Sequence, residues 1–203
     1  MKTRYIASLF YISFFILSPF AQLTIAIQPF GTFDTSLIAV ITPEIEKQFD
    51  SAAVTVLPAQ KLPQAAYYKP RNRYRADILL EKLDSINSNR YTKIIGLTNK
   101  DISTTKGDVY DWGIFGLGGL GKAPCVVSIF RMRKNSTPEL FRQRLRKVAV
   151  HELGHTFGLG HCDWPRCVMC DYRGTITSLD GTGFGFCSQC RALLRESIGK
   201  LKR

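Results

Sequence analysis

The chain has 203 residues, of which 45% are hydrophobic and 22% are charged, and its formal net charge is +12. These values are typical of a globular protein that is long enough for one domain with a sizeable core. The sequence contains no internal repeat and no low-complexity tract, which excludes a repeat protein.

The first 21 residues resemble a secretory signal peptide. Lys2 and Arg4 give the chain a basic start, and a nearly continuous apolar stretch follows at 5–17, as export signals require. Of the 28 basic residues, 26 remain without these two, against 16 acidic residues, so the rest of the chain keeps a net charge of +10. We therefore expect a secreted or periplasmic protein.

Cleavage of this segment is expected after Ala21. A later cut after Ala26 would remove most of a strand that the sequence predicts at 23–29. Two alternatives stay open. The apolar region approaches the roughly 20 residues of a membrane span, which would make 1–21 an uncleaved anchor that associates the protein with a membrane. Otherwise it is only a hydrophobic N-terminal strand.

The pattern of apolar residues then predicts alternating strands and helices. Strands are expected at 23–29, 53–57, 91–98 and 125–131, and helices at 35–49, 74–86, 137–151 and 191–200. Pro43 is expected to break or restart the first helix. The segment 58–73 is rich in Pro, Gln and Arg, and we expect it to be a mobile loop.

Five glycines lie within the ten residues 112–121. The segment lacks the pattern of a phosphate-binding loop, and no helix start follows it. A glycine-rich edge strand leaves its backbone N–H and C=O groups unshielded, so an extended peptide can pair with it. A plain bulged edge or hairpin explains the glycines equally well.

The long helix expected from Thr137 has favourable start signals, because Thr137 can cap it, Pro138 suits its first turn and Glu139 favours the helix dipole. Basic residues gather around this start, and a basic face there could attract acidic peptides, anionic lipids or nucleic acid, or be merely solvated. No aromatic residues are interleaved for base stacking, so we expect no nucleic-acid partner. The basic residues are Arg131, Arg133, Lys134, Arg142, Arg144, Arg146 and Lys147.

All three histidines of the chain fall within one eleven-residue segment, HELGHTFGLGH. On a helix, His151 and His155 lie on one face about a turn apart and can face a single cation, with Glu152 beside them. Gly158 allows the chain to leave the helix and turn back, so that His161 reaches the same ion. Three imidazoles with a fourth position left to water form a catalytic zinc site. Zinc lowers the pKa of that water to about 7, and a neighbouring carboxylate can take its proton.

Five of the six cysteines follow soon after the last histidine. Cys187 and Cys190 form a C-x-x-C pair of the kind that binds zinc. The opposite pair is open: spacing slightly favours Cys167 with Cys170, but Cys162 with Cys167 is an alternative. Either set would hold a structural zinc ion and tie this part of the chain to the active-site helix. Disulfides are the competing explanation in an exported chain.

The residues from His151 to Cys190 match the pattern H-E-x-x-H-x-x-G-x3-C-x4-C-x-M-x17-C-x-x-C at every fixed position. This run resembles the signature of the archaemetzincins, which are zincin-type metallopeptidases. The resemblance implies an α/β (α+β) fold, with a zincin-like mixed β-sheet, an active-site helix and a small C-terminal zinc-stabilised subdomain. It also implies peptide or protein substrates.

The resemblance further implies roles for individual residues. Glu152 would be the general base, and Met169 would lie in the turn beneath the metal site. Cys170 would be left over, although its exchange with Cys162 stays an alternative. Two Zn²⁺ ions per chain would be bound, the catalytic one by His151, His155 and His161, and the structural one by Cys162, Cys167, Cys187 and Cys190.

The expected organisation therefore has three parts. Residues 1–21 are a signal peptide or N-terminal anchor, 22–161 a zincin-like catalytic domain that includes the active-site helix, and 162–203 a Met-turn and four-cysteine zinc subdomain. The expected function is hydrolysis of peptide bonds by a metal-activated water. The alternative is a zinc-stabilised peptide-binding scaffold whose peptidase activity is lost or latent.

Overall fold

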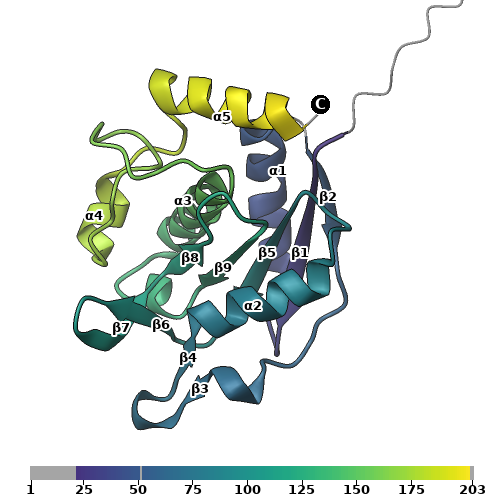
Figure 1. Cartoon of the computed structure of the whole chain (residues 1–203). Helices are drawn as coiled ribbons and strands as arrows, with labels where there is room; N and C mark the ends of the chain where they lie inside the picture. Colours follow the sequence, from purple (N-terminus) through teal and green to yellow (C-terminus); the bar gives the residue numbers. More distant parts are fainter. Residues whose placement is uncertain (1–21, 51, 202–203) are drawn as a thin grey trace, which may run out of the picture.

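The computed structural model describes residues 22–50 and 52–201, so the expected signal peptide at 1–21 lies outside the described residues. A five-stranded sheet forms the centre of the fold (Figure 1). Helix α2 (Ala76–Asn87) covers one face, and α1 (Ile38–Gln48) and α3 (Pro138–Thr156) cover the other. The C-terminal part adds α4 (Ile176–Gly181) and α5 (Ser188–Leu201).

The central sheet is mixed, as expected. Its strands are ordered β2-β1-β5-β9-β8, and only β8, at the edge, runs antiparallel to its neighbour. A helix lies between β1 and β2 (α1) and between β2 and β5 (α2), whereas the chain from β5 to its parallel neighbour β9 passes through strands, the last of which is β8. The strands are β1 (Thr24–Phe30), β2 (Ala53–Val56), β5 (Lys93–Thr98), β8 (Gly116–Gly118) and β9 (Pro124–Ser128).

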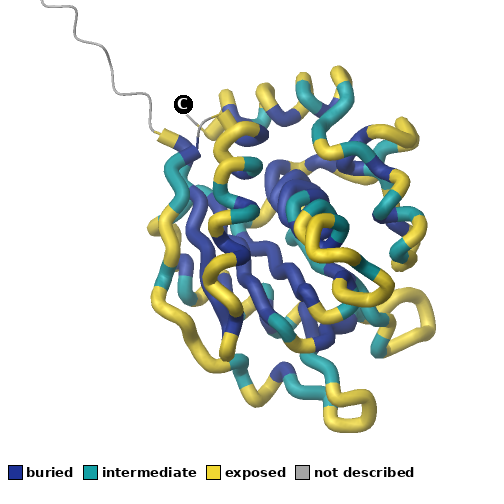
Figure 2. Tube along the Cα trace, turned by 180° about the vertical axis from the view of Figure 1, so that it is seen from behind, coloured by how far each residue is buried: buried dark blue, intermediate teal, exposed yellow. Residues whose placement is uncertain are grey.

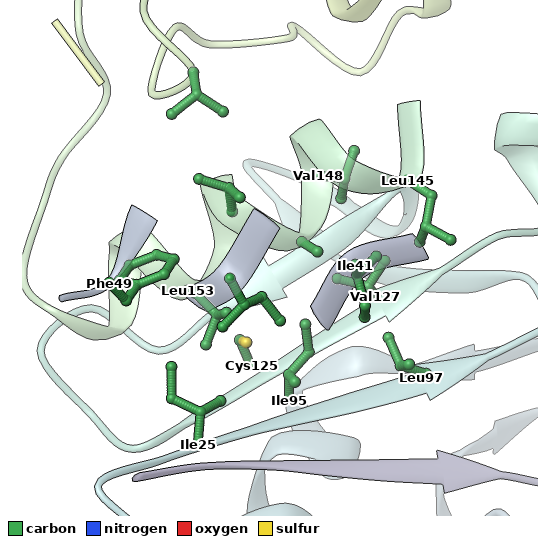
Figure 3. Close-up of a cluster of buried hydrophobic side chains, with 14 of the residues drawn as sticks. Ile25, Ile41, Phe49, Ile95, Leu97, Cys125, Val127, Leu145, Val148 and Leu153 are labelled. Atoms are coloured by element: carbon green, nitrogen blue, oxygen red, sulfur yellow. The ribbon is translucent and has the colours of Figure 1, made fainter. Parts of the chain in front are cut away.

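Side chains of the central strands alternate between two apolar layers, as the period of two in a strand dictates. Ile95 and Val127 pack toward α1 and α3, whereas their neighbours Ile94 and Val126 pack under α2. Figure 2 shows these strands and much of α3 buried within the molecule. Figure 3 shows the first layer, which includes Ile25, Ile41, Phe49, Leu97, Cys125, Leu145, Val148 and Leu153.

Helix α1 continues through Pro43, so the expected break at this residue is wrong. Ile41 and Ile45, on either side of the proline, are both completely buried in the same core. Pro43 itself and Ala39, whose carbonyl loses its helical partner, are exposed. Water can therefore satisfy that carbonyl, and the burial of the two isoleucines outweighs the cost of the proline.

The segment 58–73 is not the plain loop that its composition suggests, because it enters a second sheet of order β3-β4-β6-β7. Arg73 on β4 donates to Asp101 at 2.8 Å, and Arg75 donates to the Thr105 hydroxyl at 2.9 Å. These contacts between distant residues hold strands that are too short to be stable alone. The strands are β3 (Tyr67–Tyr68), β4 (Arg73–Arg75), β6 (Ile102–Lys106) and β7 (Val109–Ile114).

Short 3₁₀ helices complete the structure at Thr35–Leu37, Gln64–Ala66, Lys69–Arg71 and Arg131–Arg133. The helix expected at 191–200 begins earlier, at Ser188, which places Cys190 in its first turn. Within 22–50 and 52–201, no helix combines the length and the apolar character that crossing a membrane requires.

Candidate active site

Helix α3 carries the predicted site and begins as the sequence predicts. The Thr137 hydroxyl accepts from the backbone N–H of Leu140 at 3.2 Å, and Pro138 is the first helical residue. The helix ends at Thr156, and Gly158 then adopts a positive φ of 86°. Glycine tolerates that conformation without strain, and the chain can turn back toward the helix.

The three imidazoles converge on one point. The Nε2 atoms of His151 and His155 lie 3.0 Å apart, and the ligand atoms of both and of His161 lie within 4.8 Å of one another. A tetrahedral zinc ion with Zn–N bonds of 2.0–2.1 Å separates its nitrogen ligands by about 3.3 Å. The spacing of these rings therefore fits one zinc ion.

Backbone carbonyls determine which ring nitrogen faces the centre. Nδ1 of His151 lies 2.7 Å from the carbonyl oxygen of Val168, and Nδ1 of His155 lies 2.7 Å from that of Leu159. A proton on each Nδ1 leaves the lone pair of Nε2 for a metal ion. Burial lowers the pKa of both histidines, which favours the neutral form that metals bind.

Glu152 is buried beside the imidazoles, with only 5% of its surface exposed. Burial raises the pKa of this carboxyl group to about 8, although the backbone N–H of Gly118 favours the charged form. A cation held by the neighbouring imidazoles would also favour the carboxylate. The protonation state of Glu152 would therefore depend on whether the imidazoles hold a cation.

Two glycines of β8 allow this strand to lie directly against α3. A Cβ atom at Gly116 would lie 2.6 Å from Cγ of Glu152, and one at Gly118 would lie 2.5 Å from the Glu152 carbonyl oxygen and 2.7 Å from Cβ of His155. At distances below 3.0 Å, a side chain at Gly116 would displace the Glu152 side chain, and one at Gly118 would displace backbone of α3. The glycine-rich segment thus supplies β8, an edge strand in contact with α3, while its first residues, 112–114, belong to β7 of the second sheet.

Met169 lies beneath the same helix and is completely buried. A Cβ atom at Gly154 would lie 2.5 Å from its Sδ atom, so the glycine makes room for the thioether. The backbone carbonyl of Val168, the preceding residue, is the one that contacts His151. The turn around Met169 therefore supports both the helix and one imidazole.

A second cluster contains four of the predicted thiols. The Sγ atoms of Cys162, Cys167, Cys187 and Cys190 lie within 4.8 Å of one another, and the first and third of them are 3.8 Å apart. Tetrahedral zinc with Zn–S bonds of 2.3 Å would separate two sulfurs by about 3.8 Å. All six cysteines are free thiols in the described part of the chain, and Cys170 is not in this cluster.

Backbone N–H groups point at the sulfurs of this cluster. Cys167 Sγ accepts from the N–H of Met169 at 3.5 Å and from that of Cys187 at 3.3 Å. The backbone N–H of Cys190 is the main cause that lowers the pKa of Cys187 to about 7. Because the thiolate is the form that binds metal, these N–H groups favour a metal site over four neutral thiols.

A cleft of about 480 Å³ opens over the imidazoles. Besides β8, it is lined by the β6–β7 hairpin, where Nζ of Lys106 lies 5.1 Å from the ring centroid of Trp112. Asp171 and Tyr172 line it from the segment after Met169. Sequence reasoning missed Lys106, because the hairpin belongs to the sheet that it did not predict, and it also missed Asp171 and Tyr172, whereas Trp112 begins the glycine-rich segment that it had singled out.

Tyr172 is the missed residue with the closest relation to the metal ligands. Its ring centroid lies 4.4 Å from that of His151, and its hydroxyl donates to the carbonyl of Val168 at 3.1 Å. That carbonyl therefore contacts both side chains. Its position three residues after Met169 was the only available signal.

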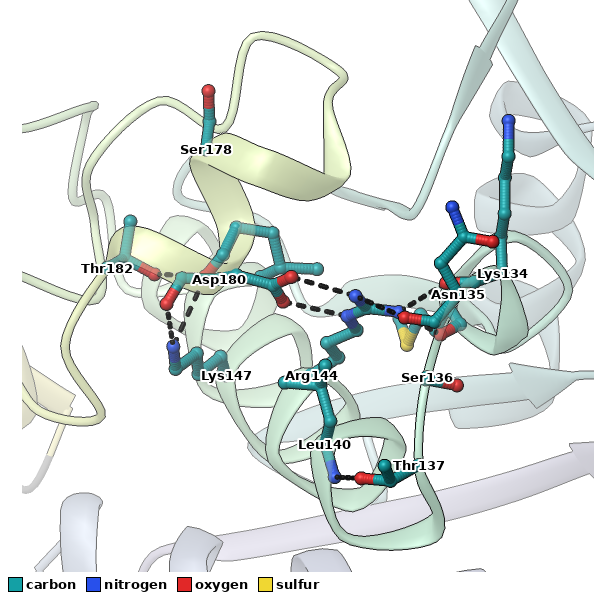
Figure 4. A network of polar contacts seen from close by, with 12 residues as sticks. Lys134, Asn135, Ser136, Thr137, Leu140, Arg144, Lys147, Ser178, Asp180 and Thr182 are labelled. Carbon is teal, nitrogen blue, oxygen red and sulfur yellow. Dashed lines mark hydrogen bonds and ion pairs between the residues drawn. The ribbon is translucent and has the colours of Figure 1, made fainter.

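Two of the seven residues of the predicted basic face at the start of α3 are buried, whereas Arg133, Lys134 and Arg142 are exposed. Arg144 and Lys147 are only 2% and 4% exposed. Arg144 donates to both carboxylate oxygens of Asp180 at 2.7 Å, and Lys147 donates to the Asp180 carbonyl at 3.0 Å (Figure 4). Both cations turn inward because they connect α3 to α4 and the adjoining backbone.

Comparison with known proteins gives a consistent result. The sequence matches Peptidase family M54 over residues 46–196. It is 36% identical over 141 residues to the archaemetzincin of Methanopyrus kandleri, covering 68% of this chain and 75% of that protein. It is 34% identical over 171 residues to the archaemetzincin of Archaeoglobus fulgidus, covering 84% of this chain and 98% of that protein.

Solved structures agree with the sequence matches. The crystal structure of the M. kandleri archaemetzincin has a TM-score of 0.79 and 30% identity, covering 93% of this chain and all of that chain. The A. fulgidus archaemetzincin, crystallised in complex with malonate, has a TM-score of 0.72 and 33% identity, covering 84% of this chain and 99% of that chain.

The fold and the histidine cluster formed by α3 and the turn after it define a zinc metallopeptidase. The match over residues 46–196 and the relatives above place the protein more closely. The chain belongs to Peptidase family M54, together with the archaemetzincins. The predicted family, fold class and enzymatic activity are thereby confirmed.

Proposed function

We propose that His151, His155 and His161 hold the catalytic zinc ion and that Glu152 is the general base of peptide-bond hydrolysis. One observation carries this assignment. The Nε2 atoms of His151 and His155 lie 3.0 Å apart, while their Nδ1 atoms are engaged by backbone carbonyls. Without a shared cation, two nitrogen lone pairs facing each other at this distance in a partly buried site would be unfavourable.

Bound zinc would polarise the scissile carbonyl and lower the pKa of the attacking water. Glu152 lies one residue from His151 on the same helix and is shielded from solvent by β8. Its carboxylate would accept a proton from the water and pass it to the departing amine. The same group then serves as base and as acid within one reaction cycle.

We propose that peptide or protein substrates pair with the free edge of β8. Within the five-stranded sheet this strand pairs only with β9, and its residues 116–118 line the cleft, where the backbone N–H of Gly118 contacts the Glu152 carboxyl group. Main-chain hydrogen bonds would align the substrate. Since β8 lies against Glu152 and His155, the aligned peptide bond would lie next to the proposed metal ligands.

The test of the catalytic assignment is a Glu152→Gln variant, assayed with a peptide library in the presence and absence of a chelator. We expect chelator-sensitive cleavage by the native protein and no turnover by the variant, with the same zinc content in both. Glu81→Gln, an exposed position on α2, is the matched control and should keep full activity. Turnover by zinc-loaded Glu152→Gln would refute the role of Glu152.

We propose that a second, structural zinc ion is bound by Cys162, Cys167, Cys187 and Cys190, which stabilises the segment 162–203. Support comes from the clustering of these four sulfurs and the N–H groups that point at them. Metal analysis should find two zinc ions per native chain and one in Cys162→Ser, whereas Cys170→Ser should retain two. One zinc ion in the native chain would contradict the proposal.

We propose that the protein is exported, with 1–21 as its signal peptide. Support comes only from the basic and apolar pattern of the sequence. Mass spectrometry of the mature N-terminus after expression in a secreting host should identify a chain that begins at Gln22. An intact N-terminus in the membrane fraction would instead indicate an anchor.

A further inference from the structure

Lys93 is a buried lysine that has no part in the proposed hydrolysis. It is the first residue of β5, and only 5% of its surface is exposed. Its ammonium group donates to the carbonyl oxygens of Thr156 at 2.6 Å and Lys122 at 3.2 Å. It also lies 4.7 Å from the ring centroid of Phe157. A buried charge persists only where such partners offset its lost hydration.

The two carbonyl groups belong to the two elements that form the site. Thr156 is the last residue of α3, where helix carbonyls lack intrahelical partners and a cation is favoured. Lys122 lies in the turn that follows β8, and its N–H donates to the carbonyl of Gly119 at 2.9 Å. One ammonium group therefore contacts both the active-site helix and the chain that continues from the edge strand.

A second hydrogen bond joins the same two elements at the same end. The N–H of Gly121, in the turn after β8, donates to the carbonyl of His155 at 2.9 Å. Gly118, the last residue of β8, lies against Glu152 and His155. The contact of Gly118 with α3 sets the distance between the strand and the helix. The hydrogen bonds of Gly121 and Lys93 set the position of β8 along the helix axis.

We propose that Lys93 is a positioning residue of the peptidase site. By holding Thr156 and Lys122 together, it sets the alignment of the substrate-binding edge of β8 with His155 and Glu152 on α3. The inference rests on the proposed function of β8 and Glu152. A substrate held by β8 reaches the catalytic groups correctly only if the strand and the helix keep this alignment.

The first test measures structure without activity. In Lys93→Met, which keeps the length of the side chain but removes its donors, backbone amide exchange should rise several-fold at 116–123 and 152–158. Exchange in β1 and α2 should not change. Lys100→Met is the matched control, because Lys100 is an exposed lysine just beyond the other end of β5. A rise in exchange across the whole sheet would indicate general destabilisation and contradict the proposal.

The second test separates alignment from chemistry. It uses the longest peptide that the native protein cleaves in the library and a version truncated to the residues around the scissile bond. For Lys93→Met, kcat/KM should fall by roughly 10- to 100-fold for the long peptide, and much less for the truncated one, with zinc content unchanged. Equal losses for both peptides would contradict a role in alignment.

Lys93→Gln, which retains one donor group, provides a milder variant if Lys93→Met does not fold. Its amide exchange rates at 116–123 and 152–158, and its kcat/KM for the long peptide, should lie between those of the native protein and those of Lys93→Met. Failure of both variants to fold would assign Lys93 to stability alone and overturn the proposal. If the native protein cleaves no peptide, the proposed function fails, but the exchange measurement still tests the contact between β8 and α3.

Discussion

The Cβ position of Gly116 lies 2.6 Å from Cγ of Glu152 and 2.7 Å from its Oε1 atom. An edge strand of the sheet and the proposed general base are thus in direct contact, and no side chain fits between them. The backbone of β8 therefore limits where the Glu152 carboxylate can lie, although Gly116 itself has no functional group.

Gly116→Ala is expected to reduce turnover sharply, because the added methyl group displaces the Glu152 carboxylate or β8. A displacement of about 1 Å costs on the order of 100-fold in rate. Steady-state kinetics with the same peptide, together with zinc analysis, measures the effect. Gly199→Ala is the control, since a Cβ atom there meets nothing within 4 Å. Unchanged kinetics for Gly116→Ala would show that this contact does not constrain Glu152.

Arg144→Met is expected to destabilise the protein by about 3 kcal/mol, because it leaves buried partners of the guanidinium group unpaired. Arg144 is 2% exposed and donates to the carbonyls of Met132 and Lys134 at 2.8 and 2.7 Å as well as to Asp180. Urea unfolding measures the loss. Arg142→Met, at an exposed position of the same helix, should change stability by less than about 0.5 kcal/mol.

The same ion pair predicts a pH dependence. The hydrogen bond from Arg144 is the main cause that lowers the pKa of Asp180 below its ordinary value of 3.8. The pair therefore contributes its full stability above that value and loses it as the pH falls through the lower, folded-state pKa. The difference in unfolding free energy between native protein and Arg144→Met should narrow in this acidic range. If this difference in unfolding free energy stays constant as the pH falls, protonation of Asp180 is not coupled to its ion pair with Arg144.

Lys93 predicts a second pH dependence, at alkaline pH, in which stability again rises with pH. Burial lowers the pKa of its ammonium group from 10.5 to about 8 in the folded state. Between these values the unfolded chain binds more protons than the folded one, so stability rises with pH. Unfolding free energies measured from pH 8 to 10.5 should therefore rise for the native protein relative to Lys93→Met. If the unfolding free energies of the native protein and of Lys93→Met change in parallel over this pH range, the pKa of Lys93 is not lowered in the folded state.

Pro43→Ala is expected to stabilise the protein by about 1–3 kcal/mol, because it restores a backbone donor and a favourable residue inside α1. The site is exposed, so no core contact is lost. Thermal or urea unfolding measures the gain. A loss of stability would contradict the expectation and mean that Pro43 stabilises the folded protein.

The clustering of the three histidines could be predicted from the sequence because their spacing is local. His151 and His155 need only one turn of helix, and Gly158 needs only a left-handed turn to return His161 to them. The helix itself has clear start signals at Thr137 and Pro138. The parallel strands are also recognisable, since burial on both faces leaves continuous apolar runs.

The parts that were missed depend on contacts between distant residues. The second sheet has strands as short as Tyr67–Tyr68 and is held by pairs such as Arg73 with Asp101, 28 residues apart. Arginine and lysine usually lie at the protein surface, so the sequence did not indicate that Arg144 and Lys147 are buried. Their burial depends on the position of Asp180, which only the structure shows. Periodicity along the chain contains no information about such partners.

His161 and Cys162 are consecutive residues that belong to different side-chain clusters. A single peptide unit thus separates the imidazole group from the thiol group, and no linker between them could absorb an insertion or a deletion. The two clusters cannot be exchanged as separate modules between homologous proteins. Any chimera that retains both must inherit the stretch from His151 to Cys190 as one piece.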